Sequence, residues 1–377
     1  MTIDLEDTQQ LLAEVDRFAR QRIALATARP EAAISPSTLQ ALTHEAQDLG
    51  LLPRAHGEDG FALWEHLHSP HAQMLNTGIL SRVARANAGV AFAWHRAAMA
   101  STVARELGCA RSAHDGLACT LVSTGHYGLA RTSLARWFKC TDPDPDDTTL
   151  LCDWLNRREH DSIVLAPHAW QTLLWPVWLQ GEVRWQKLDR AQLQVTPCPG
   201  QHGLDEMMAY TVRANAPTSE PIACGPEQSR QIYQRVLKMD MLGLLAIGHG
   251  ALLHGQALAT AYAGVRKQGG ATIDQHPAVQ HLLAEIDMAR QQAELALSGM
   301  SAPIDQIDLG HLCATRISTH QMLCHAANQV IQVHGGSGYM RDTGAEKIVR
   351  DQNMLKLQIG GTRDAQLFVA GWIGGGV

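Results

Sequence analysis

The segment QVHGGSGYMRD, from Gln332 to Asp342, follows a long stretch in which apolar residues recur at helical spacing. Its glycines at positions 335, 336 and 338 can end a helix, or can let the backbone approach a phosphate group. The segment is not the dinucleotide-binding fingerprint of a Rossmann fold, because that motif follows a strand and this one follows a helix. It therefore predicts the end of a long helix and a candidate ligand-binding loop.

Upstream of this segment, the apolar pattern predicts three long helices. The first covers about residues 231–268, the second begins at Pro277, and the third covers about residues 310–333. Long helices joined by short polar connections are typical of an antiparallel bundle. The C-terminal part of the chain is therefore expected to be a helical bundle.

The preceding sequence divides into a helical part and a β-rich part. Apolar spacing predicts helices in the first 109 residues, with one continuous stretch at about 72–107. An acidic run with two prolines, residues 142–147, predicts a surface turn. Short runs of β-forming residues between turn residues lie at 162–166, 182–185, 192–195 and 209–212. We expect a mainly α fold with a central β domain, divided into a helical domain (1–109), a β domain (110–222) and a helical bundle (223–377).

Composition removes several classes of function. The chain has 377 residues with 31 basic and 37 acidic side chains, so it has no basic surface for nucleic acid. No apolar run reaches the roughly 20 residues that cross a bilayer, and we expect no membrane span and a cytoplasmic protein. The eight cysteines form no C-x-x-C pair. The histidines at 66, 68 and 71 have no cysteine or carboxylate at zinc spacing, so we expect no metal site.

Residues 330–362 resemble the C-terminal signature of the acyl-CoA dehydrogenase family. A second segment, YAGVRKQGG from Tyr262 to Gly270, resembles the Y-x-x-x-R-x-x-F-G motif that ends the first bundle helix in that family, with Gly269 in place of the phenylalanine. The order of helices, β domain and four-helix bundle also fits. The resemblance implies an FAD-dependent flavoprotein in which the cofactor lies between the last two domains and reaches a neighbouring subunit, and hence a homodimer or homotetramer.

The resemblance also implies which residues meet FAD. Arg266 would contact the pyrophosphate across the subunit interface, where a permanently charged fork suits the anion. Trp154 resembles a tryptophan that flanks the flavin ring, and Ser123 lies where the family has another flavin-binding loop. The candidate cofactor-binding residues are Arg266, Gln332, Gly335, Gly336, Gly361, Thr362, Ser123 and Trp154.

The family reaction needs a carboxylate to remove the α-proton of an acyl thioester while the β-hydrogen leaves as hydride to flavin N5. Most members take this base from a Y-E-G-T segment, but residues 357–362 of this chain read LQIGGT. Gly360 stands at the glutamate position when the segments are aligned on G-T, and no alignment supplies a carboxylate. The backbone N–H of Gly360 can still polarise the thioester oxygen.

A minority of members, similar to isovaleryl-CoA dehydrogenase, carry the base on the first bundle helix, 26 residues before the motif arginine. That position is Asp240 in this chain. Its neighbours are mostly apolar, so we expect a buried acid with a raised pKa. The alternative is a structural role, in which Asp240 pairs with Lys238 or another bundle residue, or caps a helix break near Gly243.

The resemblance thus implies an oxidoreductase acting on CH–CH donors, which dehydrogenates an acyl thioester of CoA or of a carrier protein, with Asp240 and Gly360 as catalytic groups. An electron-transferring flavoprotein is the implied electron acceptor. Two alternatives remain open, namely a flavin monooxygenase or oxidase on the same fold and a catalytically silent partner subunit. The divergent middle domain favours these alternatives, whereas the intact C-terminal signature and Asp240 favour the dehydrogenase.

Overall fold

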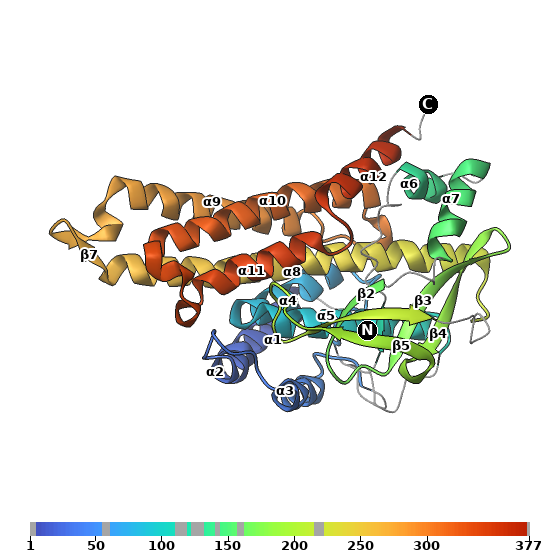
Figure 1. Ribbon diagram of the computed structural model, residues 1–377, viewed down its shortest axis with the longest axis horizontal. Coiled ribbons are helices and arrows are strands. Elements are labelled where there is room, and N and C mark those ends of the chain that lie inside the picture. Colours follow the sequence, from blue (N-terminus) through green and yellow to red (C-terminus); the bar gives the residue numbers. More distant parts are fainter. Residues whose placement is uncertain are drawn as a thin grey trace.

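The computed structural model describes residues 5–54, 61–109, 119–121, 132–139, 144–156, 162–214 and 222–374. One helix, α8 (Pro226–Val265), runs along the length of the molecule (Figure 1). Most of the other bundle helices lie on one side of it, and the N-terminal helices and the sheets lie on the other (Figure 1). The fold class expected from the sequence, mainly α with a small central β region and a C-terminal bundle, is confirmed.

The N-terminal helices are α1 (Leu5–Phe18), α2 (Ala24–Ala26), α3 (Pro36–Asp48), α4 (Ala72–Ala86) and α5 (Ala88–Glu106). The start of α3 follows the predicted signal, because the Ser35 side chain accepts a hydrogen bond from the Thr38 backbone. The expectation of one helix at 72–107 is wrong. Asn87 adopts an extended conformation and its side chain caps α5 by accepting from the Val90 N–H, so two helices form where the apolar pattern is continuous.

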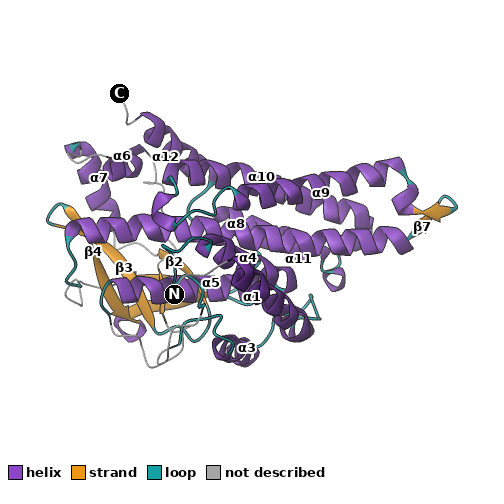
Figure 2. Ribbon diagram, turned by 180° about the vertical axis from the view of Figure 1, so that it is seen from behind, coloured by secondary structure: helices purple, strands orange, loops and turns teal. Residues whose placement is uncertain are grey.

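The strands form two small sheets beside the N-terminal half of α8 (Figure 2). One has the order β1 (Cys119–Leu121), β3 (Thr172–Leu179) and β4 (Glu182–Asp189), and the other has the order β2 (Ser162–Ala166), β6 (Met208–Ala214) and β5 (Leu193–Cys198). All four predicted runs lie in or overlap strands. The sequence did not predict β3, which contains Pro176, and proline disfavours a central strand. The proline is tolerated because β1 pairs only with residues 172–174 and does not reach Pro176.

Between β1 and β2, the described residues form the helices α6 (Thr132–Lys139) and α7 (Pro145–Leu155). The expectation of a surface turn at 142–147 is therefore wrong for its second half. Pro145 is the first residue of α7, and the Asp146 N–H donates to the Asp144 carboxylate. Acidic residues and proline suit the first turn of a helix, where backbone N–H groups lack partners, and so the same residues can begin a helix.

The bundle contains α8, α9 (Pro277–Ser298), α10 (Leu309–His334), α11 (Ala345–Leu357) and α12 (Thr362–Gly374). A short hairpin of β7 (Lys267–Gln268) and β8 (Ala271–Thr272) joins α8 to α9 at the far end. Helix α10 ends at His334, directly before the glycines, as the sequence predicted. Helix α8 begins five residues before the predicted start, because Pro226 supplies a first-turn proline.

The largest apolar cluster includes residues of the N-terminal helices, the sheets and the bundle, so the three sequence segments share one core. Among the described residues, α8 is the one helix long and apolar enough to cross a membrane, and 94% of its most apolar window is buried within the protein. Glycines let other helices approach it closely. A Cβ atom on Gly250 would lie 2.1 Å from the Ser81 carbonyl oxygen of α4.

We predict opposite effects for two glycine-to-alanine substitutions in α8. Gly250→Ala should lower the free energy of unfolding by about 1–3 kcal/mol or more, because the new methyl group must push α4 away. Gly264→Ala should be neutral or stabilise by up to about 1 kcal/mol, since nothing lies near its Cβ position. Urea unfolding of both variants measures the difference, and equal stabilities would contradict the close α4–α8 contact.

Candidate active site

Asp240 lies in the middle of α8 and is almost fully buried, with 2% of its surface exposed. Both of its carboxylate oxygens have partners on α5. His95 Nε2 lies 3.0 Å from Oδ1, and the Arg96 guanidinium lies 3.0 Å from Oδ2. The structure thus brings together three titratable side chains, of which the sequence indicated only Asp240.

The hydrogen bonds of His95 determine where its proton lies. Trp64 Nε1 donates to His95 Nδ1 over 3.0 Å, and an indole N–H can only donate. His95 Nδ1 is therefore unprotonated, so Nε2 carries the hydrogen and donates it to Asp240. Burial lowers the pKa of His95 despite the nearby carboxylate, and so the ring is neutral at pH 7.

The expected raised pKa of Asp240 is wrong. Burial by itself raises the pKa of a carboxyl group, but the charge of Arg96 and the hydrogen bond from His95 act in the opposite direction and lower it overall. Sequence spacing reveals apolar neighbours along α8, but it does not reveal an arginine that approaches from α5. Asp240 is consequently ionised at neutral pH.

Three structural alternatives were expected for Asp240, namely a pair with Lys238, a pair with another bundle residue, and a cap at a helix break. Its two observed partners lie on α5 instead, and the Lys238 pair and the helix break are not found. Lys238 Nζ donates to the carbonyl of Ile304, at 3.1 Å, and α8 is continuous past Gly243. Gly243 instead makes room for a partner, since a Cβ there would lie 2.3 Å from the His95 ring. A glycine one turn after Asp240 is thus a condition for the His95 contact.

Arg96 connects Asp240 with the loop that carries Gly360. The Arg96 guanidinium donates to Gln358 Oε1 over 3.3 Å, and Arg316 of α10 donates to the Gln358 carbonyl. Ile359 and Gly360 follow with φ angles of +61° and +85°. A left-handed conformation is strained for a β-branched residue, so tertiary contacts hold this loop in a defined shape. Arg96 therefore contacts both Asp240 and Gln358, which lies two residues before Gly360.

Four of the expected FAD-binding residues gather at the far end of the bundle. Tyr262 stacks on His334 with ring centroids 4.5 Å apart, and Ser337 Oγ lies 3.2 Å from the Tyr262 hydroxyl. These contacts join the end of α8 to the loop after α10. The expected FAD-binding residues at this end of the bundle are all exposed, and they are Arg266, Gln332, Gly335 and Gly336.

The other described candidates lie elsewhere. Gly361 and Thr362 are at the start of α12, separated from the Gly335 loop by α11, whose 13 residues span about 20 Å. Trp154 belongs to α7, and Ser123 lies outside the described residues.

The donors present fit an anionic dinucleotide. Arg266 offers an exposed guanidinium, and open space surrounds the backbone at Gly335, Gly336 and Gly361. Gly361 also lies at a helix N-terminus, where backbone N–H groups favour anions. Gly335 has φ +60° and ψ −139°, a conformation that only glycine adopts readily.

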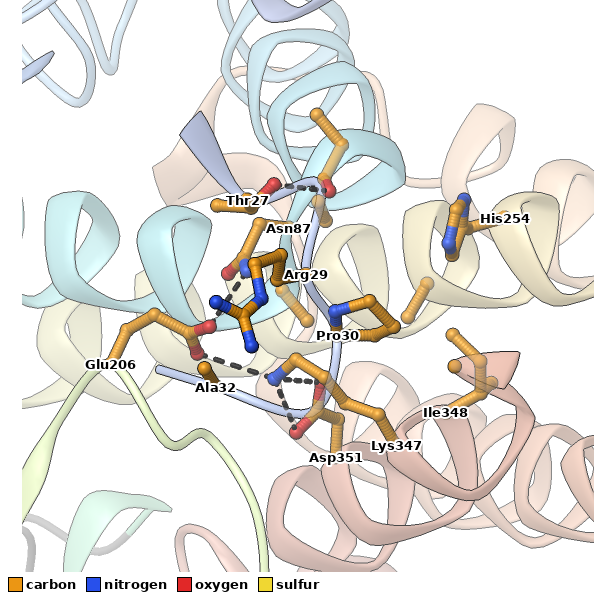
Figure 3. A pocket seen from close by; sticks show the side chains of 15 residues that line it. Thr27, Arg29, Pro30, Ala32, Asn87, Glu206, His254, Lys347, Ile348 and Asp351 are labelled. Atoms are coloured by element: carbon orange, nitrogen blue, oxygen red, sulfur yellow. Dashed lines mark hydrogen bonds and ion pairs between the residues drawn. The ribbon is translucent and has the colours of Figure 1, made fainter. Parts of the chain in front are cut away.

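A second cluster of buried charges connects the loop before β6 to α11 (Figure 3). Lys347 lies 3.3 Å from Glu206 and 3.1 Å from Asp351, beside a cavity of about 40 Å³. Burial lowers the pKa of Lys347, but the two carboxylates outweigh it and raise the pKa overall. Asn87, which caps α5, donates to Glu206 over 2.7 Å. The cluster thus joins all three sequence segments.

Comparison with known proteins assigns the C-terminal part of the chain. Residues 232–369 match the family model of the acyl-CoA dehydrogenase C-terminal domain. This C-terminal region of the chain is thus similar to the acyl-CoA dehydrogenase family. A probable acyl-CoA dehydrogenase, YngJ of Bacillus subtilis, is 35% identical over 116 residues, which are 29% of this chain and 30% of that protein. The 3-sulfinopropanoyl-CoA desulfinase of Paraburkholderia xenovorans is 30% identical over 132 residues, which are 34% of this chain and 32% of that enzyme.

Solved structures extend the similarity to the whole fold of this chain. The prolyl acyl carrier protein oxidase AnaB has a TM-score of 0.72 at 14% identity, with 99% of this chain and 100% of that chain covered. A glutaryl-CoA dehydrogenase from Mycobacterium smegmatis in complex with FADH2 has a TM-score of 0.73 at 12% identity, covering 99% of this chain and 95% of that one. At these identities the comparison establishes the fold. The curated relatives above align over only about a third of their own length.

We predict that the buried Lys347 cluster is important for stability. Lys347→Met leaves Glu206 and Asp351 buried without their cation and should lower the free energy of unfolding by about 3–5 kcal/mol. Arg20→Met removes an exposed ion pair with the same four-residue spacing and should change stability by about 1 kcal/mol or less. Unfolding midpoints test the contrast, and a small effect of Lys347→Met would contradict the role of the cluster.

Stability should also fall with acid because buried histidines resist protonation. Burial is the main cause that lowers the pKa of His249 from 6.5 to about 4, so at intermediate pH the unfolded chain binds more protons than the folded protein. The contribution of His249 to the free energy of unfolding is therefore fully present above pH 6.5. About 3 kcal/mol of it is lost as the pH falls to about 4. The unfolding midpoint measured against pH should show this loss, and His249→Asn should make the curve shallower. An unchanged slope in that variant would contradict the prediction.

Proposed function

We propose that the protein is an FAD-dependent oxidoreductase that dehydrogenates an acyl thioester at Cα and Cβ, with Asp240 as the base. The observation that carries this proposal is a buried carboxylate, kept ionised on α8, next to the loop that contains Gly360. A base must be unprotonated before the reaction, and Asp240 meets that condition at neutral pH. The family of the C-terminal region supports the reaction class.

Asp240 can accept the α-proton while it keeps its two partners. A carboxylate offers about four lone-pair sites, and His95 and Arg96 each occupy one. When Asp240 takes up the proton, its negative charge disappears and Arg96 remains positive beside the thioester. Arg96 is therefore placed to stabilise the enolate that forms, together with the backbone N–H of Gly360.

FAD, when bound, supplies the acceptor for the β-hydride. Gly361 and Thr362 would hold it near the thioester, and the exposed group that contains Arg266, Gln332, Gly335 and Gly336 would hold its pyrophosphate. Because α11 separates these groups by about 20 Å, we propose that the second group serves the cofactor of a neighbouring copy, in a homodimer or homotetramer. Ser123 and Trp154 stay proposed contacts of the flavin.

The thioester is proposed to be a CoA ester or a carrier-protein ester, because proteins of similar fold include a glutaryl-CoA dehydrogenase and an acyl carrier protein oxidase. An electron-transferring flavoprotein is the proposed electron acceptor. A cytoplasmic location is likewise proposed, as are the domain boundaries near residues 109 and 222.

One observation favours a second candidate, a catalytically silent partner subunit. Both oxygens of Asp240 already have charged or polar partners inside the protein, which is also the arrangement of a purely structural carboxylate. The two candidates differ in a single measurable property. A silent subunit binds FAD, or lends residues to a neighbour that does, but its own flavin is not reduced by thioesters.

Anaerobic reduction of the FAD-loaded protein by a panel of thioesters tests the proposal. The panel contains butyryl-CoA, isovaleryl-CoA, octanoyl-CoA and a prolyl carrier protein. We expect at least one member to bleach the flavin absorbance, and subsequent exposure to air distinguishes a dehydrogenase, which reoxidises slowly, from an oxidase. Retention of the flavin colour with every thioester would leave the silent subunit as the better description.

Asp240→Asn should keep the flavin spectrum and slow its reduction by about 10²–10⁴-fold, because the amide cannot take the α-proton. Asp147→Asn is the matched control, since Asp147 is equally buried and pairs with Arg136 on α6, outside the candidate site. Its reduction rate should stay within about threefold of the wild type. Equal rates for Asp240→Asn and the wild type would assign the base to another residue.

A further inference from the structure

Trp64 is held in an unusual conformation next to the candidate site. It is fully buried, and its φ angle of +66° lies in the left-handed region that non-glycine residues rarely adopt. Its backbone N–H donates to Asn76 on α4 over 2.9 Å, and its carbonyl accepts from Thr102 on α5 over 3.0 Å. Two helices therefore maintain a strained backbone whose side chain donates to His95. Strain of this kind persists only where surrounding contacts over-determine it.

We propose that His95 is a positioning residue that orients the Asp240 carboxylate for proton abstraction, and that Trp64 fixes the ring orientation of His95. This inference rests on the proposed function, because it concerns the same carboxylate. It adds two residues, from α5 and from the segment before α4, that neither the sequence motifs nor the family match of residues 232–369 includes.

The geometry gives His95 one task that Arg96 cannot perform alone. Arg96 binds one oxygen of Asp240, and a carboxylate held by one oxygen can rotate about its side-chain bonds. His95 binds the other oxygen, so the plane of the carboxylate is fixed by contacts at both ends. Trp64 in turn fixes the ring of His95 by donating to its other nitrogen, Nδ1. The ring packs against Gly243, where a side chain would leave no room for it.

The hydrogen bond also affects when Asp240 is ionised. The groups that act on its charge are Arg96 and His95 on α5 and Arg316 on α10. Of these, His95 is neutral and acts through its Nε2–H. Loss of this donor removes one of the contacts that lower the pKa of Asp240, so the carboxylate should begin to protonate at higher pH.

Two amide substitutions at His95 separate its contacts. In His95→Asn, the side-chain amide reaches only the place of Nδ1, so it can still bond Trp64 but not Asp240. In His95→Gln, the longer side chain places an amide N–H near the position of Nε2 and can bond Asp240. Both residues are polar and uncharged, so the pair differs mainly in reach.

The experiment measures flavin reduction against pH in the FAD-loaded full-length variants, with whichever thioester of the panel reduces the wild type. For His95→Asn we expect the acidic limb of the rate profile to move to higher pH by about one unit and the rate to fall by at least tenfold. His95→Gln should restore most of both properties. Trp64→Phe should slow reduction by less than His95→Asn, without changing FAD content.

His249→Asn is the control, because His249 is also a buried histidine with a lowered pKa but bonds Ser81, at 2.9 Å, instead of Asp240. Its acidic limb should match the wild type. If His95→Asn has the same acidic limb and the same reduction rate as the wild type, the positioning role is overturned. The proposed dehydrogenase activity of the wild type is not affected by that result. If His95→Asn does not fold, the other two variants still test the positioning role. A wild-type reduction rate in Trp64→Phe would overturn it. A reduction rate in His95→Gln as low as that of Asp240→Asn would also overturn it.

A second readout does not depend on turnover. Infrared titration of protein with labelled aspartate, with Asp240→Asn subtracted, reports protonation of the Asp240 carboxyl directly. We expect protonation to occur at higher pH in His95→Asn than in the wild type or in His95→Gln. Identical titrations in all three would overturn the proposed contact, whereas failure of every thioester to reduce the wild-type flavin would contradict only the proposed function.

Discussion

A carboxylate in the middle of α8 imposes the main physical constraint on this protein. Asp240 lies within the apolar core that the N-terminal helices, the sheets and the bundle share, and an unpaired charge there would be strongly destabilising. The fold meets this constraint by placing His95 and Arg96 of α5 on its two oxygens. The packing of α5 against α8 and the ionisation of Asp240 are therefore one requirement.

Small residues make this arrangement sterically possible. Gly243 leaves room for the His95 ring, and Gly250 leaves room for the backbone of α4 at Ser81. Without a side chain at these positions, α4 and α5 can approach α8 closely enough for short hydrogen bonds between helices. Glycine weakens a helix slightly, and the close packing that it permits offsets that loss.

The same rule governs the second buried cluster. Lys347 lies between two carboxylates, one on α11 and one on the loop before β6, so the cluster joins elements from different parts of the chain. Buried ion pairs contribute little net stability compared with apolar packing, but removal of one partner is costly. Such clusters therefore specify which elements must meet, and this one joins the middle segment to the bundle.

The sequence by itself determined the order of the elements, the long helices and the C-terminal family signature, because helical periodicity and the glycine loop after His334 are local patterns. Through the family resemblance it also indicated Asp240 as the candidate base, since the base position of some family members lies at a fixed distance from Arg266 along one continuous helix. Three features were missed because a local preference was reversed. The side chain of Asn87 caps a new helix, β3 tolerates Pro176 because β1 does not extend beside it, and Pro145 begins α7 instead of a turn. Only the tertiary structure revealed that His95 and Arg96 bind Asp240, that Trp64 donates to His95, and that the pKa of Asp240 is lowered. Apolar neighbours along a helix indicate that a residue is buried, but its charge partners depend on which helix packs opposite. Here the contact between His95 and Asp240 joins residues 145 positions apart.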